Sequence, residues 1–367
     1  MTKLNAGKGS IPELHVYDEA CLLPEGSSHD RWIALLLFIG SCLYLRLFYN
    51  YTILNADEGI VLQGAQRILQ GEVLYRDFFS FFTPGSYYWM ALLFKIFGSS
   101  ILVGRGALIF YGGMFSALSY LIARRVCARW SALLVAFFVT LTCLPHRFLI
   151  LHNWDSTLWA YLALYCAVWL TQRPHLVWTF AMGFFAALTC LFEQSKGAGL
   201  VLGLGLGFLI LNWSGRDWRV WTRRRVMTAL GGFAGPFFLT FLYFGIKHTL
   251  PQLLADWYWP LTHYSAVNKV SFGFLALDPA QRGDLYAGTL SSRFLMLLIT
   301  SPWFIVPVFP FLAVGCLAYW IAKAKRESSS PKKANYYILT SATLVGLLIS
   351  IAVIAGWPRP GSAAFPC

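Results

Sequence analysis

Two adjacent carboxylates, Asp57 and Glu58, stand out in a chain that is otherwise mostly apolar. They belong to a polar stretch that follows the first long apolar run. A carboxylate at a membrane surface can take the proton of an alcohol and so activate it as a nucleophile. The simpler interpretation is a helix start, because Asn55 with Glu58 forms a capping-box pattern. We expect Asp57 to act as a general base or a metal ligand, and Glu58 to cap the helix or contact the substrate.

A second acidic residue, Asp155, follows a later apolar run and has His152 and Asn153 as neighbours. The sequence leaves two interpretations open, which are the N-cap of a helix beginning at Thr157 and a second catalytic carboxylate. His152 adds a hydrogen-bonding group for a substrate. One histidine beside one aspartate is too little to define a metal site, so a requirement for a divalent metal stays open.

Glu193 and Lys196 form a third polar group, between two apolar runs. Charges in such a place must pair with each other or reach water. One interpretation is a local ion pair at a tight turn; the other gives Lys196 the task of binding a phosphate oxygen. For Arg105, simple snorkelling to the interface is slightly favoured. The further candidate substrate or phosphate contacts are Arg67, Arg76, Asp77 and Arg105.

The composition places these groups in a membrane protein. Apolar residues make up 57% of the 367 residues, and charged residues only 12%. A soluble domain carries roughly a quarter charged residues. The net charge of +13 therefore indicates basic cytoplasmic loops, not a nucleic-acid partner.

The polar segment after the first span, which covers about residues 32–49, predicts a surface helix. Its apolar residues share one helix face from Ile60 to Gln70, and Gly71 ends it. The following apolar run, Ser86 to Phe97, is only about twelve residues long. It is too short to cross ~30 Å of hydrocarbon, so it predicts an interfacial or re-entrant segment.

Treating that run as non-spanning puts the basic clusters on one side and the acidic motifs on the other, as the positive-inside rule requires. The predicted fold class is an all-α transmembrane bundle of about nine spans, with the N-terminus inside and the C-terminus outside. The later spans are expected at about 106–123, 131–149, 157–170, 177–192, 198–212, 227–246, 294–322 and 336–355. The expected organisation is a cytoplasmic tail (1–30), a transmembrane domain (31–356) with outer loops at 51–98 and 247–293, and an outer tail (357–367).

Four stretches in this order carry a family resemblance. They are Ala56-Asp-Glu-Gly59, Gly71-Glu-Val-Leu-Tyr-Arg-Asp-Phe-Phe79, Pro84-Gly-Ser-Tyr-Tyr-Trp89 and Phe94-Lys-Ile-Phe-Gly98. Together they resemble the first outer loop of GT-C glycosyltransferases. The most similar branch contains the protein O-mannosyltransferases and the bacterial aminoarabinose transferase that modifies lipid A. The resemblance covers about residues 30–200.

The resemblance implies roles for particular residues. Asp57 is similar to the essential outer-loop aspartate of that family, and Asp155 to its second acidic residue. The family takes its sugar from a polyprenyl phosphate and works on the periplasmic or lumenal side. Where the aminoarabinose transferases have a lysine before the proline, this chain has Thr83 before Pro84. The phosphate-binding cation is therefore expected to be Lys196 or Arg67.

The expected function is that of an inverting, membrane-embedded glycosyltransferase. It would move a sugar from a polyprenyl phosphate to a hydroxyl of a glycolipid, polysaccharide or protein. The bacterial inner membrane is the expected location, with the site facing the periplasm. A lipid-linked sugar transporter or flippase, and a relative that binds polyprenyl phosphate without catalysis, stay open. Charges at span ends, without a visible inverted repeat, favour the enzyme over the transporter.

Overall fold

A computed structural model describes residues 28–50, 56–145, 148–214, 222–264, 283, 287–294, 296–297, 308–324 and 331–355. Several expectations fall outside these residues. They are the tail before residue 28, the Asn55 cap, most of the outer loop beyond residue 264 and the outer tail. The side chain of Asp57 is also outside the described part, although its backbone lies in a helix.

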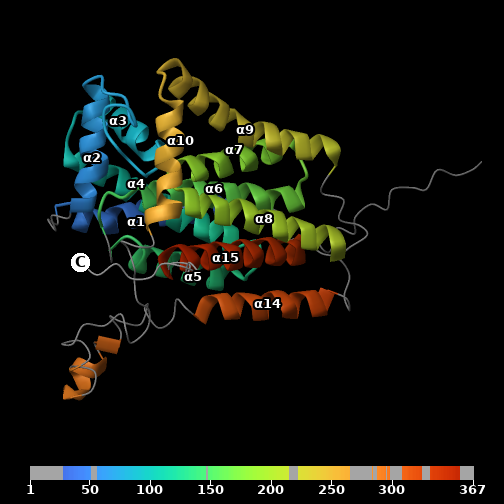
Figure 1. The fold of residues 1–367 in the computed structure, drawn as a ribbon. Coiled ribbons are helices and arrows are strands. Elements are labelled where there is room, and N and C mark those ends of the chain that lie inside the picture. Colours follow the sequence, from blue (N-terminus) through green and yellow to red (C-terminus); the bar gives the residue numbers. More distant parts are fainter. Residues whose placement is uncertain are drawn as a thin grey trace, which may run out of the picture.

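All the main elements of the described chain are helices, which confirms the expected all-α class for this part (Figure 1). The first half contains α1 (Ser28–Leu45), α2 (Ala56–Leu69), α3 (Gly85–Phe97), α4 (Ile101–Ala123), α5 (Arg129–Thr142) and α6 (His152–Gln172). The second half contains α7 (Leu176–Phe192), α8 (Gln194–Ser214), α9 (Arg223–Ile246), α10 (Leu250–Trp259), α14 (Phe309–Ala324) and α15 (Pro331–Ala355). One 3-10 turn, Arg46–Phe48, extends α1, and one π turn, Pro260–Tyr264, follows α10.

Four described helices are long and apolar enough to cross a membrane, so the chain is an integral membrane protein. They cover His29–Phe48, Ile101–Ala123, Gln194–Trp213 and Arg223–Ile246. The total of nine spans stays a prediction. The structure corrects the span expected at 131–149, because α5 ends at Thr142. Pro145 follows closely, and proline both lacks the backbone donor and disfavours helix in the residue before it.

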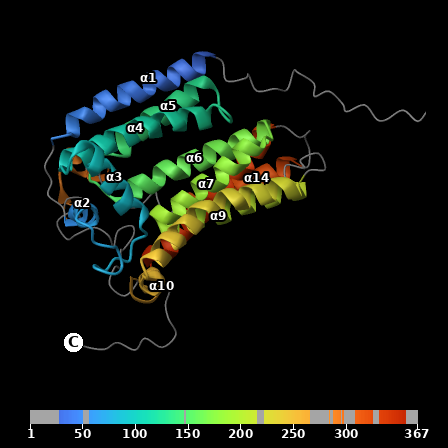
Figure 2. The same ribbon diagram turned by 90° about the horizontal axis from the view of Figure 1, so that it is seen from above.

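Two short helices lie across one end of the long ones. Figures 1 and 2 place α2, α3 and α10 together at the same end of the bundle, where α2 and α10 cross the axes of the long helices. This agrees with the expected surface helix, and Gly71, with φ of +95°, ends it as predicted. The 13-residue α3 is as short as expected, while its re-entrant character stays a prediction.

Glycines let two pairs of long helices approach closely. On α8, a Cβ at Gly203 would lie 2.5 Å from the Cα of Ala342 in α15. On α7, a Cβ at Gly183 would collide with the carbonyl of Ala229 in α9. On α9, a Cβ at Gly232 would collide with the carbonyl of Phe180 in α7. Small residues at such crossings bring backbones into contact, which is how helices in a membrane associate.

Candidate active site

A buried ion pair fixes the start of α2 against α4. Arg105 and Glu58 are 2% and 3% exposed, and the guanidinium donates two hydrogen bonds of 3.4 Å to the carboxylate. The carbonyl of Tyr49 accepts a third, and the backbone N–H of Ile150 donates to Glu58, both at 3.4 Å. Snorkelling was therefore the wrong expectation for Arg105. Burial is tolerated because the two charges satisfy each other. The pair positions the first turn of α2, which contains Asp57.

Charges in the last turn of α2 and in the loop after it hold this loop together. Arg67 pairs with Glu72, donates to the carbonyl of Asp77 at 3.0 Å, and lies 4.4 Å from the ring centre of Phe78. Arg76 pairs with Asp77 at 2.8 Å, and this contact lowers the pKa of Asp77 to about 2. Each predicted phosphate contact in this loop thus has an intramolecular partner. Their role toward a substrate stays a prediction.

Lys196 lies within hydrogen-bonding distance of four oxygens. They are Glu193 Oε2 at 2.9 Å, Asn153 O at 2.7 Å, and the hydroxyls of Ser156 and Thr157 at 2.8 Å each. An ammonium group has only three protons. A phosphate oxygen can therefore bind Lys196 only by replacing one of these partners. The local ion pair that the sequence left open is present, and phosphate binding by Lys196 stays a proposal.

Asp155 lies in the first turn of α6, ahead of the span predicted from Thr157. The helix begins at His152, after Leu151 in an extended conformation. The stretch between the spans expected at 131–149 and 157–170 is therefore already helical from His152, and an N-cap role for Asp155 was wrong. The carboxyl group is 4% exposed. Burial raises the pKa of Asp155 to about 7, against the opposing effects of Ser86, Tyr111 and Lys196.

Three elements meet around this group. Ser86 belongs to α3 and Tyr111 to α4, and both lie beside the carboxyl group of Asp155. The ring of His152 lies 4.1 Å, centre to centre, from that of Phe82. The structure thus brings Asp155, His152, Glu193 and Lys196 to the same end of the bundle as Glu58 and Arg105. It places Arg67, Arg76 and Asp77 apart from them, in the last turn of α2 and in the loop that follows.

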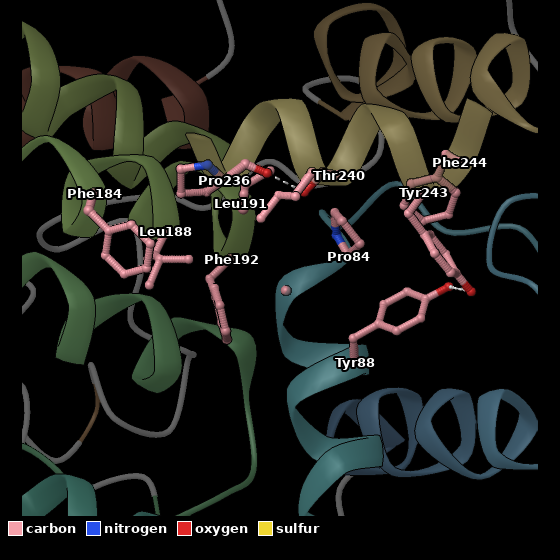
Figure 3. A pocket seen from close by; sticks show the side chains of 12 residues that line it. Pro84, Tyr88, Phe184, Leu188, Leu191, Phe192, Pro236, Thr240, Tyr243 and Phe244 are labelled. Carbon is pink, nitrogen blue, oxygen red and sulfur yellow. Dashed lines mark hydrogen bonds between the residues drawn. The ribbon is translucent and has the colours of Figure 1, made fainter. Parts of the chain in front are cut away.

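An apolar groove of about 370 Å³ adjoins this polar end, and the sequence analysis did not predict it (Figure 3). The groove begins directly beyond the contact of Gly183 with α9. Its walls are Phe184, Leu188, Leu191 and Phe192 of α7, and Pro236, Leu239, Thr240, Tyr243 and Phe244 of α9; Pro84, Gly85 and Tyr88 close one end. Only apolar periodicity marks most of these residues, and every span shares it. The interior Pro236 was the one available signal.

Specific contacts hold α3 against the end of the groove. The hydroxyl of Tyr88 donates to that of Tyr243 at 3.3 Å, as Figure 3 shows. A Cβ at Gly85 would lie 2.6 Å from the carbonyl of Leu191, so glycine lets α3 reach the end of α7.

Helix α10 covers the outer face of the loop between α2 and α3. The backbone N–H of Ser80 donates to Asp256 at 3.3 Å, and the indole of Trp257 donates to the hydroxyl of Tyr75 at 2.9 Å. Phe81 stacks on Trp259. Within the described residues, no three side chains of His, Cys, Asp or Glu gather to hold a metal.

The fold and site define an all-helical integral membrane protein with a polar end beside an apolar groove. No family model and no curated protein matches the chain. Among solved structures, it is similar to ArnT from Cupriavidus metallidurans bound to undecaprenyl phosphate, with 17% identity and a TM-score of 0.45. The match covers 87% of this chain and 59% of that one. A likeness of this size assigns no function, so the function proposed below rests on the residues of this chain.

Proposed function

We propose that this protein is a membrane-embedded, inverting glycosyltransferase that uses a polyprenyl-phosphate sugar. One observation carries the proposal: residues that line the apolar groove are followed directly in the chain by residues of the polar end. Leu191 and Phe192 line the groove, and Glu193 follows directly; Gly85 lines it, and Ser86 lies beside Asp155. A lipid-linked sugar has an apolar tail and a charged head, and therefore needs adjoining surfaces of these two kinds.

The groove suits the tail of the donor. Its lining follows α7 and α9 for about two helical turns each, which is roughly 12 Å. This groove offers an isoprenoid chain mainly apolar contact, because the hydroxyls of Thr240, Tyr88 and Tyr243 in its lining already take part in intramolecular hydrogen bonds. The phosphate and sugar would then lie beyond Phe192, near Glu193, Lys196 and the first turn of α6.

The reaction requires one base and one cation. The acceptor hydroxyl loses its proton to Asp57, and its oxygen attacks the anomeric carbon. The bond between that carbon and the phosphate oxygen breaks, its electron pair stays on the phosphate, and the configuration inverts. Lys196 stabilises the departing phosphate by exchanging one of its oxygen partners for a phosphate oxygen. Asp155 takes part in holding the donor, while Glu58 and Arg105 position α2.

The side chain of Thr83 is a reason to expect a polar head group near the end of the groove. Its side chain is 2% exposed, and its hydroxyl has no hydrogen-bond partner among the described residues. The side-chain N–H of Gln194, beside Glu193, also lacks an acceptor there. Buried polar atoms normally find partners, and the hydroxyls of a sugar or the oxygens of a phosphate are suitable ones.

Turnover of labelled polyprenyl-phosphate sugars by purified protein, with membrane lipid extract as acceptor, tests this function. Wild type is expected to transfer label, and Asp57→Asn to lose transfer at an unchanged melting temperature. Turnover of the wild type in EDTA decides whether a divalent metal is required. Glu72→Gln, a half-exposed carboxylate in the next loop, is the matched control and is expected to keep turnover. Normal turnover in Asp57→Asn would refute the role of Asp57. Movement of the donor across liposomes without product would identify a flippase, and donor binding alone would identify a non-catalytic relative.

A further inference from the structure

A buried arginine without an acidic partner lies at the opposite end of the bundle. Arg125 follows the end of α4 and is 7% exposed. The nearby acid, Asp30, already pairs with Arg124 at 3.2 Å and with Arg129 at 3.5 Å. Among the described residues, no carboxylate lies within ion-pair distance of Arg125 itself. Arg105, the other buried arginine, has Glu58, so the two positions differ in charge balance.

The direct neighbours of Arg125 give it one acceptor and also carry donors that have no partner in the described part of the chain. Its guanidinium lies 4.1 Å from the ring centre of Trp169, and its Nη1 donates to Gln172 Oε1 at 2.8 Å. The indole N–H of Trp169 and the amide N–H of Gln172 are buried and have no acceptor in the described structure. The Gln172 amide must present its oxygen to Arg125, because a guanidinium has only donors and would face another donor if the amide were flipped. One positive charge without an ion-pair partner and two donors without an acceptor therefore lie on neighbouring side chains among the described residues.

The surroundings add positive potential. Arg173 lies 5.8 Å from the same Trp169 ring. The start of α15 packs here, since the hydroxyl of Tyr336 donates to the carbonyl of Val126 at 2.9 Å. The amino end of a helix has a partial positive charge. A water molecule would satisfy a donor but would leave the charge of Arg125 uncompensated, whereas an anion satisfies both.

We infer that Arg125, Trp169 and Gln172 form a phosphate-binding site that is separate from the proposed active site. Phosphate oxygens accept hydrogen bonds from a guanidinium and from N–H donors of the kind that Trp169 and Gln172 leave unpaired. The site lies just beyond a helix long enough to span the membrane, α4, which is the level of lipid head groups. The phosphate is that of an anionic phospholipid or a free phosphate ion, and the experiment separates these two sources.

Lipid binding measured on the intact, delipidated protein tests the inference. Native mass spectrometry with phosphatidylglycerol, phosphatidylcholine or inorganic phosphate gives the occupancy for each. Trp169→Phe removes one donor but keeps the ring, and is expected to weaken phosphatidylglycerol binding about tenfold. Arg125→Gln is expected to weaken it further. Arg224→Gln removes an exposed arginine from the first turn of α9 and is the matched control for general surface charge.

Each outcome is decisive. Preference for phosphatidylglycerol that falls in Trp169→Phe and not in Arg224→Gln supports a lipid site. Binding of inorganic phosphate with the same mutational pattern, and without lipid preference, supports a free phosphate ion instead. No anion binding by the wild type, or equal losses in Trp169→Phe and Arg224→Gln, would overturn the inference. If Arg125→Gln does not fold, Trp169→Phe still decides, because it preserves the stacking surface.

Discussion

The buried pair of Glu58 and Arg105 makes a prediction about stability that is independent of catalysis. Arg105→Met removes the guanidinium and leaves a carboxylate that is 3% exposed. Two hydrogen bonds join Arg105 to Glu58, one joins Arg105 to Tyr49, and one joins Ile150 to Glu58. Only the last of these, from the N–H of Ile150, would remain in the variant. Removing one partner of a buried pair costs about 3–5 kcal/mol. We expect a melting temperature lower by several degrees in detergent.

A double-mutant cycle gives the test its precision. Glu58→Gln/Arg105→Met leaves no unpaired charge, so its loss is expected to be smaller than the sum of the two single losses by about 2 kcal/mol. Arg67→Met/Glu72→Gln provides the exposed comparison, because both of its side chains are 35% exposed and such pairs contribute at most about 1 kcal/mol. Thermal unfolding of all variants in the same detergent measures these differences. Additive effects at Glu58 and Arg105, or equal coupling in both cycles, would refute the role of burial.

Three further predictions concern the site. The pKa of Asp155, at about 7, lies above its unfolded value of about 3.9. Between about pH 3.9 and about pH 7 the carboxyl group is therefore more protonated in the folded than in the unfolded state, and the free energy of unfolding falls as the pH rises through this range. The melting temperature of Asp155→Asn should therefore fall less from pH 5 to pH 8 than that of wild type, and equal slopes would contradict this. Leu188→Trp places a larger side chain in the groove and should raise KM for the donor severalfold. Leu202→Trp, at an exposed position on α8, should leave KM unchanged. Equal effects of the two substitutions would exclude the groove as the site of the lipid tail. Gly183→Val should lower stability by about 1–3 kcal/mol because its side chain meets the carbonyl of Ala229, and an unchanged melting temperature would show that α7 and α9 can separate.

Local patterns were enough to predict the elements. Apolar length predicted helices close to α1, α4, α7, α8 and α9, and the amphipathic run with Gly71 predicted α2. These signals work because hydropathy, helical period and a residue that accepts positive φ act over a few neighbours. The two boundary errors have local causes as well. Pro145 ends α5 early, and the extended Leu151 starts α6 at His152.

The sequence by itself determined which residues carry charge and that the chain enters a membrane. Only the tertiary structure decided the partners. Glu58 meets Arg105 47 positions away, and Lys196 is surrounded by oxygens of α6 and of Glu193. Arg125 has no carboxylate within ion-pair distance among the residues that the structure describes. The groove also depends on tertiary structure, because its apolar residues resemble those of other helices and only the packing of α7 against α9 leaves a space between them. A charged side chain in a membrane must be compensated. Which group compensates it depends on which helices pack together, and that choice is made by close contacts at residues such as Gly183 and Gly232.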